Sequence, residues 1–104
     1  MSNCILNVVN DNTLVLKGRI SFDNVVMLRD LGLKYIKSMA EVVVDLRDLS
    51  SCDSSVLALI SSWIKFTTKN AIDLQIINPP TYLLDLSRFS GLKDILPFNF
   101  NKDK

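Results

Sequence analysis

Apolar and polar residues along this chain form short strand-like runs separated by longer helical patterns. Runs suited to strands cover residues 4–9, 13–17, 41–46 and 73–78. The polar turn at residues 10–12 favours a hairpin between the first two runs. The run at 41–46 contains three consecutive valines, which is typical of a strand covered on both faces.

Two of the intervening segments carry helical periodicity. The first covers residues 22–38. Gly18 ends the strand before it, and Ser21 is a suitable N-cap for the helix. The second covers residues 54–69, and apolar residues fill about half of its helical wheel, whereas a surface helix needs a stripe of only about 100°. This second helix is therefore either deeply buried, or its apolar residues form an exposed ridge that binds a partner. The pattern leaves both interpretations open.

The C-terminal part predicts a third helix over residues 82–89, which follows two prolines and is capped by Thr81. Residues 92–98 are expected to form a last helical turn or short strand, and residues 99–104 a polar tail. Alternation of strands and helices predicts a single α/β domain with a mixed sheet of four to five strands and three to four helices packed mainly on one side. The predicted core comprises Val43, Leu46, Leu57, Ile60, Ile64, Leu74, Ile76, Leu83 and Leu86.

A serine-rich turn separates the valine run from the second helix. Ser50, Ser51, Asp53, Ser54 and Ser55 all fall within this short stretch. The N-terminus of a helix presents unpaired backbone N–H groups and a partial positive charge. The turn can therefore cap the helix, bind an anion, carry a phosphate or dock a partner.

Composition narrows the classes of function. The 104 residues suit one domain, and 12 basic against 11 acidic residues indicate no general attraction to nucleic acid or to anionic membranes. The chain has no histidine, so it lacks the usual general base and the commonest zinc ligand. We expect no enzyme activity, no metal and no cofactor, and we expect Cys4 and Cys52 to be reduced thiols.

Membrane insertion is not expected either. No apolar run approaches the roughly 20 residues needed to span a bilayer. The first residues lack the basic region and apolar core of a secretory signal. These features predict a cytoplasmic protein.

Three local patterns resemble the STAS domains, named for sulphate transporters and anti-sigma factor antagonists, and the resemblance covers about residues 5–98. The patterns are LKGRISF at residues 16–22, DSSVLALISSW at 53–63, and the segment from LLDLSRFSGL to ILP at 83–97. The turn DSSVL within the second pattern is similar to the family's turn sequence, D-[ST]-[SG]-G-L. The second and third patterns together resemble in particular the stand-alone, MlaB-like STAS subunit of the Mla phospholipid transporter.

That resemblance implies binding rather than catalysis. A subunit of this kind docks on the ATPase of an ABC transporter at the inner face of the inner membrane, through the turn and the adjacent helix. It supports assembly and activity of a complex that maintains outer-membrane lipid asymmetry. The match implies six partner-binding residues: Asp53, Ser54, Ser55, Leu57, Leu59 and Trp63. The helical wheel places the last three as apolar support or contact.

The same family suggests an alternative function. In anti-sigma factor antagonists a serine at this turn is the phosphoacceptor, and that position matches Ser55, with Ser54 as the second candidate. The chain would then be a signalling switch controlled by phosphorylation. Val56 replaces the family glycine that follows the turn, and a stiff β-branched side chain there makes close approach by a kinase or partner harder.

Overall fold

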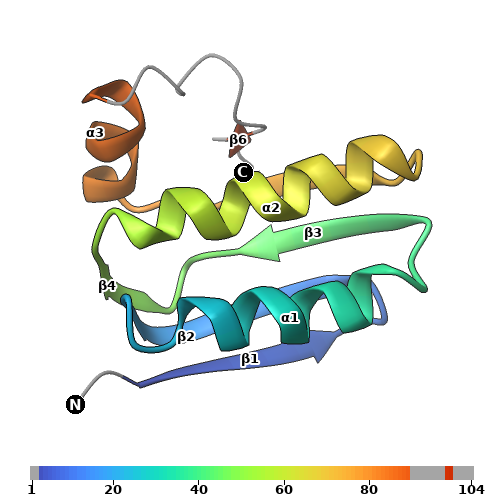
Figure 1. The fold of residues 1–104 in the computed structure, drawn as a ribbon, viewed down its shortest axis with the longest axis horizontal. Helices are drawn as coiled ribbons and strands as arrows, with labels where there is room; N and C mark the ends of the chain where they lie inside the picture. The colour runs from blue at the N-terminus through green and yellow to red at the C-terminus, as the bar shows by residue number, and fades with distance from the viewer. Residues whose placement is uncertain (1–2, 90–97, 100–104) are drawn as a thin grey trace.

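The computed structural model describes residues 3–89 and 98–99, and its sheet forms one layer of the molecule (Figure 1). The strands within this part are β1 (Cys4–Val9), β2 (Thr13–Ile20), β3 (Glu41–Asp45), β4 (Leu49–Cys52), β5 (Asp73–Ile77) and β6 (Phe98–Asn99). Five of them follow the order β1-β2-β3-β5-β6, and β4 pairs with β2 off this path. β1 is antiparallel to β2, whereas all other pairings are parallel.

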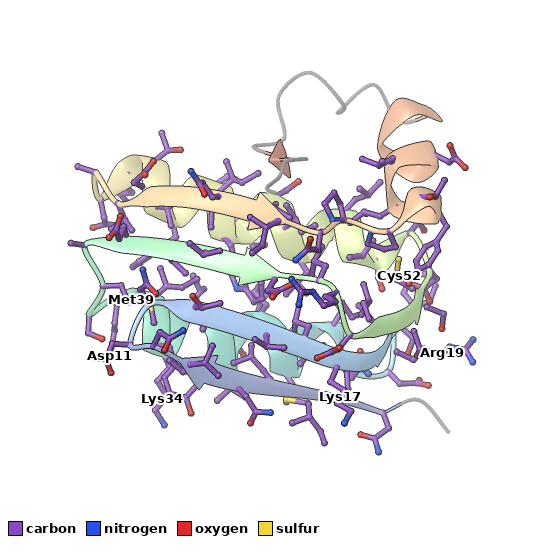
Figure 2. The ribbon with its side chains drawn as sticks, turned by 180° about the vertical axis from the view of Figure 1, so that it is seen from behind. Asp11, Lys17, Arg19, Lys34, Met39 and Cys52 are labelled. Atoms are coloured by element: carbon purple, nitrogen blue, oxygen red, sulfur yellow. The ribbon has the colours of Figure 1, made fainter. Side chains whose placement is uncertain are left out.

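Two long helices, α1 (Val25–Ile36) and α2 (Ser55–Lys69), lie side by side on one face of the sheet (Figure 1). A third, α3 (Thr81–Phe89), lies near the start of α2, and the Tyr82 hydroxyl donates to the Leu49 carbonyl of β4 at 3.2 Å. Figure 2 shows the opposite face of the sheet in front of the helices. The mixed sheet and the one-sided helices confirm the predicted fold class.

The hydrophobic core lies between the sheet and helices α1 and α2. Leu46, Ile60, Ile76 and Leu83 are buried there as predicted. Partly buried side chains that pack against this core include Leu57, Ile64 and Leu74, and the side chain of Leu86 lies outside the described part of the structure.

The prediction for Val43 was wrong. Its neighbours Val42 and Val44 fill the core, while Val43 is half-buried on the other face. Successive side chains of a pleated strand point to opposite faces. Three consecutive valines therefore do not place the middle one in the same core as the outer two.

Gly18 does not end β2, contrary to the prediction. Its φ of +116° is a conformation that side-chain-bearing residues rarely adopt, and a Cβ there would meet the Cys4 Cα at 3.2 Å. The Ser50 hydroxyl donates to its carbonyl at 2.8 Å. Glycine thus lets β2 continue to Ile20 while β1 and β4 approach it closely.

The start of α1 also differs from the prediction, since the helix begins at Val25 with Asn24 at its N-cap. The Asn24 side chain accepts from the Ser21 amide at 3.0 Å and donates to the Arg19 carbonyl at 2.8 Å. The Ser21 hydroxyl accepts from the Asp23 amide at 3.3 Å, and the amides of Asn24 and Val25 donate to its backbone carbonyl and not to its side chain. The segment after β2 is therefore a turn held by Asn24 rather than a helix capped by Ser21.

β4 was not predicted. It contains Ser50 and Ser51, which the sequence pattern placed in a turn. The first residues of β2 pair with β3 and its last residues pair with β4. The expected closing element at 92–98 and the expected tail at 99–104 lie mostly outside the described part of the structure. Only Phe98–Asn99 is described there, as the short strand β6.

Candidate docking site at the start of helix α2

The turn before α2 is held against the end of β2. The amide of Asp53 donates to the Ile20 carbonyl at 3.1 Å, immediately after the pairing of Cys52 with Ile20. β4 therefore carries the turn to the connection between β2 and α1. Two segments about thirty residues apart in the chain meet at this point.

Asp53 organises the turn through its carboxylate. Its Oδ1 accepts from the Ser55 amide at 2.9 Å and also from the Ser55 hydroxyl. The Ser55 hydroxyl is the main reason that the pKa of Asp53 lies below its ordinary value of 3.8, and the amides of Ser55 and Phe22 and the charge of Arg19 act in the same direction. Ser54 occupies the N-cap position but makes no side-chain cap bond, so the capping acceptor is Asp53 rather than a serine.

The three turn residues differ in accessibility. Ser54 is exposed and Asp53 is partly exposed, but Ser55 is only 6% exposed. The hydroxyl of Ser55, which matches the family phosphoacceptor position, is thus buried and bonded to Asp53. Among the three, Ser54 presents the freest side chain to a partner.

Val56, which replaces the family glycine, points into the core. Its side chain is 0% exposed and its backbone φ is not positive. Valine adopts this helical conformation without the penalty that a left-handed position would impose. The branched side chain therefore does not stand between Ser54 and a partner, and the expected hindrance does not arise.

Leu59 and Trp63 were predicted as apolar support or contact, and the structure places both in the core. Each is 1% exposed, whereas Leu57 is half-buried. The Trp63 indole Nε1 donates to the Arg29 carbonyl of α1 at 3.2 Å. The broad apolar arc of α2 thus reflects a deeply buried helix, and Leu59 and Trp63 support the surface from within instead of forming a ridge.

Two exposed apolar side chains beside the turn were missed by the sequence argument. Phe22 is 76% exposed and Val26 is 55% exposed. The Phe22 amide helps to lower the pKa of Asp53, which places this residue next to the turn. Val26 and Ala58 line one hollow of about 110 Å³ between α1 and α2. We call Phe22, Val26, Ser54 and Ala58 the Ser54 surface.

A signal for Phe22 was present in the sequence, as the last residue of the LKGRISF pattern. The signal was missed because the sequence placed Phe22 at the start of the first helix and gave it no role of its own. In the structure Phe22 lies in the turn before the helix, where nothing in the described chain covers it. Phe22 and Val26 together give the Ser54 surface an exposed apolar part.

The two thiols have no features of reactive cysteines. Burial raises the pKa of Cys4 to about 11, and burial together with the charge of Asp53 raises the pKa of Cys52 to about 11. Figure 2 shows Cys52 at the end of the sheet near α3. Within the described residues, no cluster of three or more His, Cys, Asp or Glu side chains could hold a metal ion. No helix in that same part of the chain has the length and apolar character needed to cross a membrane.

A protein-family model described as "Mlab, STAS domain" matches residues 8–97. The chain belongs to the MlaB-like STAS domain family. STAS domains mediate protein–protein interactions and are generally binding or signalling domains rather than catalysts. A search of curated proteins finds no match to this chain.

Solved structures of anti-sigma factor antagonists share the STAS fold. Unphosphorylated SpoIIAA is 20% identical, with a TM-score of 0.75 over 97% of this chain and 90% of that chain. The phosphorylated form of SpoIIAA, a Bacillus cell fate determinant, is 19% identical, with a TM-score of 0.69 over 97% and 93%. An antagonist from Mycobacterium paratuberculosis is 13% identical, with a TM-score of 0.73 over 94% and 85%. At these identities the likeness shows the fold alone.

Proposed function

We propose that this STAS domain is a non-catalytic subunit that docks on the ATPase of an Mla-type phospholipid ABC transporter. The proposal is supported by the family match over residues 8–97 and above all by the exposed Ser54 surface at the family's docking turn. Such a subunit is held at the cytoplasmic face of the inner membrane by its partner. It supports assembly and activity of a complex that maintains outer-membrane lipid asymmetry.

The chemistry of the Ser54 surface suits a protein contact. Burial of an exposed side chain such as Phe22 against a partner contributes about 1.5–3 kcal/mol, and aromatic residues are enriched among interface hot spots. Ser54 can donate or accept a hydrogen bond beside it. Because Asp53 already orders the turn, docking requires little further loss of conformational entropy.

The first test is to identify the partner. Tagged protein is purified from detergent-solubilised membranes of its native host, and its partners are identified by mass spectrometry. We expect recovery of an ABC ATPase together with its permease. Recovery of a serine kinase or a sigma-factor regulator would overturn the proposal in favour of the signalling switch, and an added phosphate in intact-mass spectra would then be sought on Ser54 and Ser55.

A charge at Ser54 tests the docking surface directly. Ser54→Glu should weaken binding to the purified ATPase by about tenfold or more, because it buries an unpaired carboxylate in the contact. A glutamate in the first turn favours the helix, so the fold should be retained. Thr68→Glu, on the exposed last turn of the same helix, is the matched control. Equal affinity of both variants would contradict the model. Ser55→Glu is unsuitable, because that side chain is buried.

Removal of the aromatic side chain tests the apolar part of the same surface. Phe22→Ala should weaken ATPase binding by about 30-fold, corresponding to a hot spot of about 2 kcal/mol. Ile5→Ala is the control, since Ile5 is 52% exposed but lies on β1. Unchanged affinity of Phe22→Ala, or an equal loss in both variants, would contradict a contact made through Phe22. Titration by surface plasmon resonance measures the dissociation constant of each variant.

A further inference from the structure

A furrow runs between helices α1 and α2, leading away from the Ser54 surface. The hollow that contains Val26 and Ala58 adjoins a second hollow of about 390 Å³, because both are lined by Arg29 and Ser62. We call the two together the α1–α2 furrow. From Ala58 to Lys69 it extends about 17 Å along α2. The larger hollow is lined by Arg29, Leu33, Ser61, Ser62, Lys65, Phe66 and Lys69.

The larger hollow is basic. Helix α2 contributes Lys65 and Lys69 and contains no acidic residue along its length, while α1 contributes Arg29. Arg29 pairs with Asp30 of its own helix at 3.0 Å. Lys65 and Lys69 have no described carboxylate within 4.0 Å, although both border the hollow.

The floor of the hollow is apolar. Leu33 and Phe66 are partly buried and pack against the core beneath the basic side chains. The volume of about 390 Å³ exceeds the space that a single small anion needs. Because isolated ion pairs at an exposed site contribute only about 0–1 kcal/mol, useful affinity requires several carboxylates together with apolar contact.

We propose that the α1–α2 furrow binds an acidic segment of a partner protein. Its carboxylates contact Lys65, Lys69 and Arg29, and an apolar side chain packs on Leu33 and Phe66. Charge complementarity carries this assignment, and the concave shape favours a peptide over an anionic membrane, since a flat bilayer surface does not enter a groove between two helices. At 3.3–3.6 Å per residue, about five extended residues span the furrow. The inference does not depend on the identity of the partner proposed above.

The test uses a fluorescein-labelled peptide LLEDEDE and its amide counterpart LLQNQNQ, which retains the shape and apolar residues but no side-chain charge. Binding to the full chain is followed by fluorescence anisotropy at low and high salt. We expect the acidic peptide to bind at least about tenfold more tightly at low salt and to lose this advantage as salt screens the charges. Equal binding of the two peptides would overturn the proposal.

Charge variants locate the site. Lys65→Glu with Lys69→Glu should weaken binding of the acidic peptide by about tenfold or more, because attraction becomes repulsion. The control is Lys17→Glu with Lys34→Glu, which changes net charge equally but lies along the β1 edge of the molecule (Figure 2). Lys65→Gln with Lys69→Gln replaces the reversal variant if circular dichroism shows that the reversal unfolds the helix. An equal loss in the control and the furrow variants would also overturn the proposal.

A membrane surface is the competing occupant. Sedimentation with mixed phosphatidylcholine–phosphatidylglycerol vesicles is measured for the same variants. Retention on vesicles that requires Lys65 and Lys69, without binding of the acidic peptide, would replace the peptide by an anionic membrane. Peptide binding that depends on these lysines, with no retention on vesicles, supports the proposal.

Discussion

Asp53 accepts two hydrogen bonds from Ser55 and thereby orders the turn from which Ser54 projects. The two serines consequently have different roles, although they are neighbours of identical chemistry. Ser55 is part of the support, because its hydroxyl is buried against the carboxylate. Ser54 remains the residue that a partner reaches, so experiments on this turn must treat the two positions separately.

Removal of the Asp53 carboxylate should destabilise the fold. Asp53→Ala is expected to lower the free energy of unfolding at pH 7 by about 0.5–2 kcal/mol, the usual loss of a helix cap. Because the pKa of Asp53 is lowered in the folded state, its contribution is fully present above about pH 4, where the unfolded-state carboxylate is ionised, and is lost as pH falls through the lowered value.

Urea unfolding of the wild type and of Asp53→Ala across pH 2–7 measures this contribution. The difference between the two proteins should shrink on acidification below about pH 4. Asp48→Ala, at an exposed carboxylate before β4, serves as control and should leave the unfolding free energy within about 0.5 kcal/mol of the wild type. A difference that stays constant with pH would show that the Asp53 carboxylate charge is not responsible.

At the scale of elements, the contact between α1 and α2 depends on a glycine and a tryptophan. A Cβ on Gly32 would lie 2.6 Å from the Trp63 Cε2 and 2.8 Å from its Nε1. The indole therefore packs directly against the α1 backbone at Gly32, and its N–H donates to the Arg29 carbonyl. This contact sets the spacing of the two helices and with it the width of the α1–α2 furrow.

Gly32→Ala should lower the stability of the fold, whereas a glycine-to-alanine substitution within a helix usually raises it. In an ordinary helix interior this change stabilises by roughly 0.5–1 kcal/mol. Here the added methyl group meets Trp63, and overpacking should cost about 1–3 kcal/mol. Thermal unfolding measures the effect.

A double-mutant cycle with Trp63→Phe checks the assigned cause. The smaller ring leaves room for the methyl group, so Gly32→Ala should cost less in the Trp63→Phe background. Additive effects of the two substitutions would show that the methyl group and the indole do not compete for the same space.

At the scale of the whole molecule, the sheet and its two long helices share one core, and Trp63 lies within it. Trp63 is the single tryptophan of the chain, so its fluorescence reports on that core. We expect its emission and the far-ultraviolet circular dichroism to change at the same urea concentration, because a single core of this size unfolds cooperatively. Separate transitions would show that the helical layer detaches from the sheet before the sheet unfolds.

Much of the element order was predictable, and the missed strand β4 has a clear physical cause. β1 has the predicted bounds, and β3 and β5 end one residue earlier than expected. β4 was missed because serines have little preference for strands and are common in turns. Its backbone becomes a strand only because the end of β2, about thirty residues earlier in the chain, is present to pair with it.

The candidate site was predictable in its location but not in its chemistry. The turn residues were identified from a local motif, yet Leu59 and Trp63 proved to be core and Phe22 proved to be surface. A helical wheel shows which side of a helix is apolar. It does not show how much of that side the neighbouring elements cover.

The sequence by itself determined the class of this protein: an α/β fold without histidine chemistry, with a serine turn between a strand and a helix. These properties follow from composition and from local periodicity, which a linear chain contains in full. Only the tertiary structure decided that Asp53 caps the turn, that Ser54 and Phe22 are exposed together, and that three basic side chains border one furrow. The turn is anchored by the bond from the Asp53 amide to the distant Ile20 carbonyl, and the exposure and the furrow likewise depend on contacts between residues distant in the chain. Local pattern does not specify which distant surfaces meet.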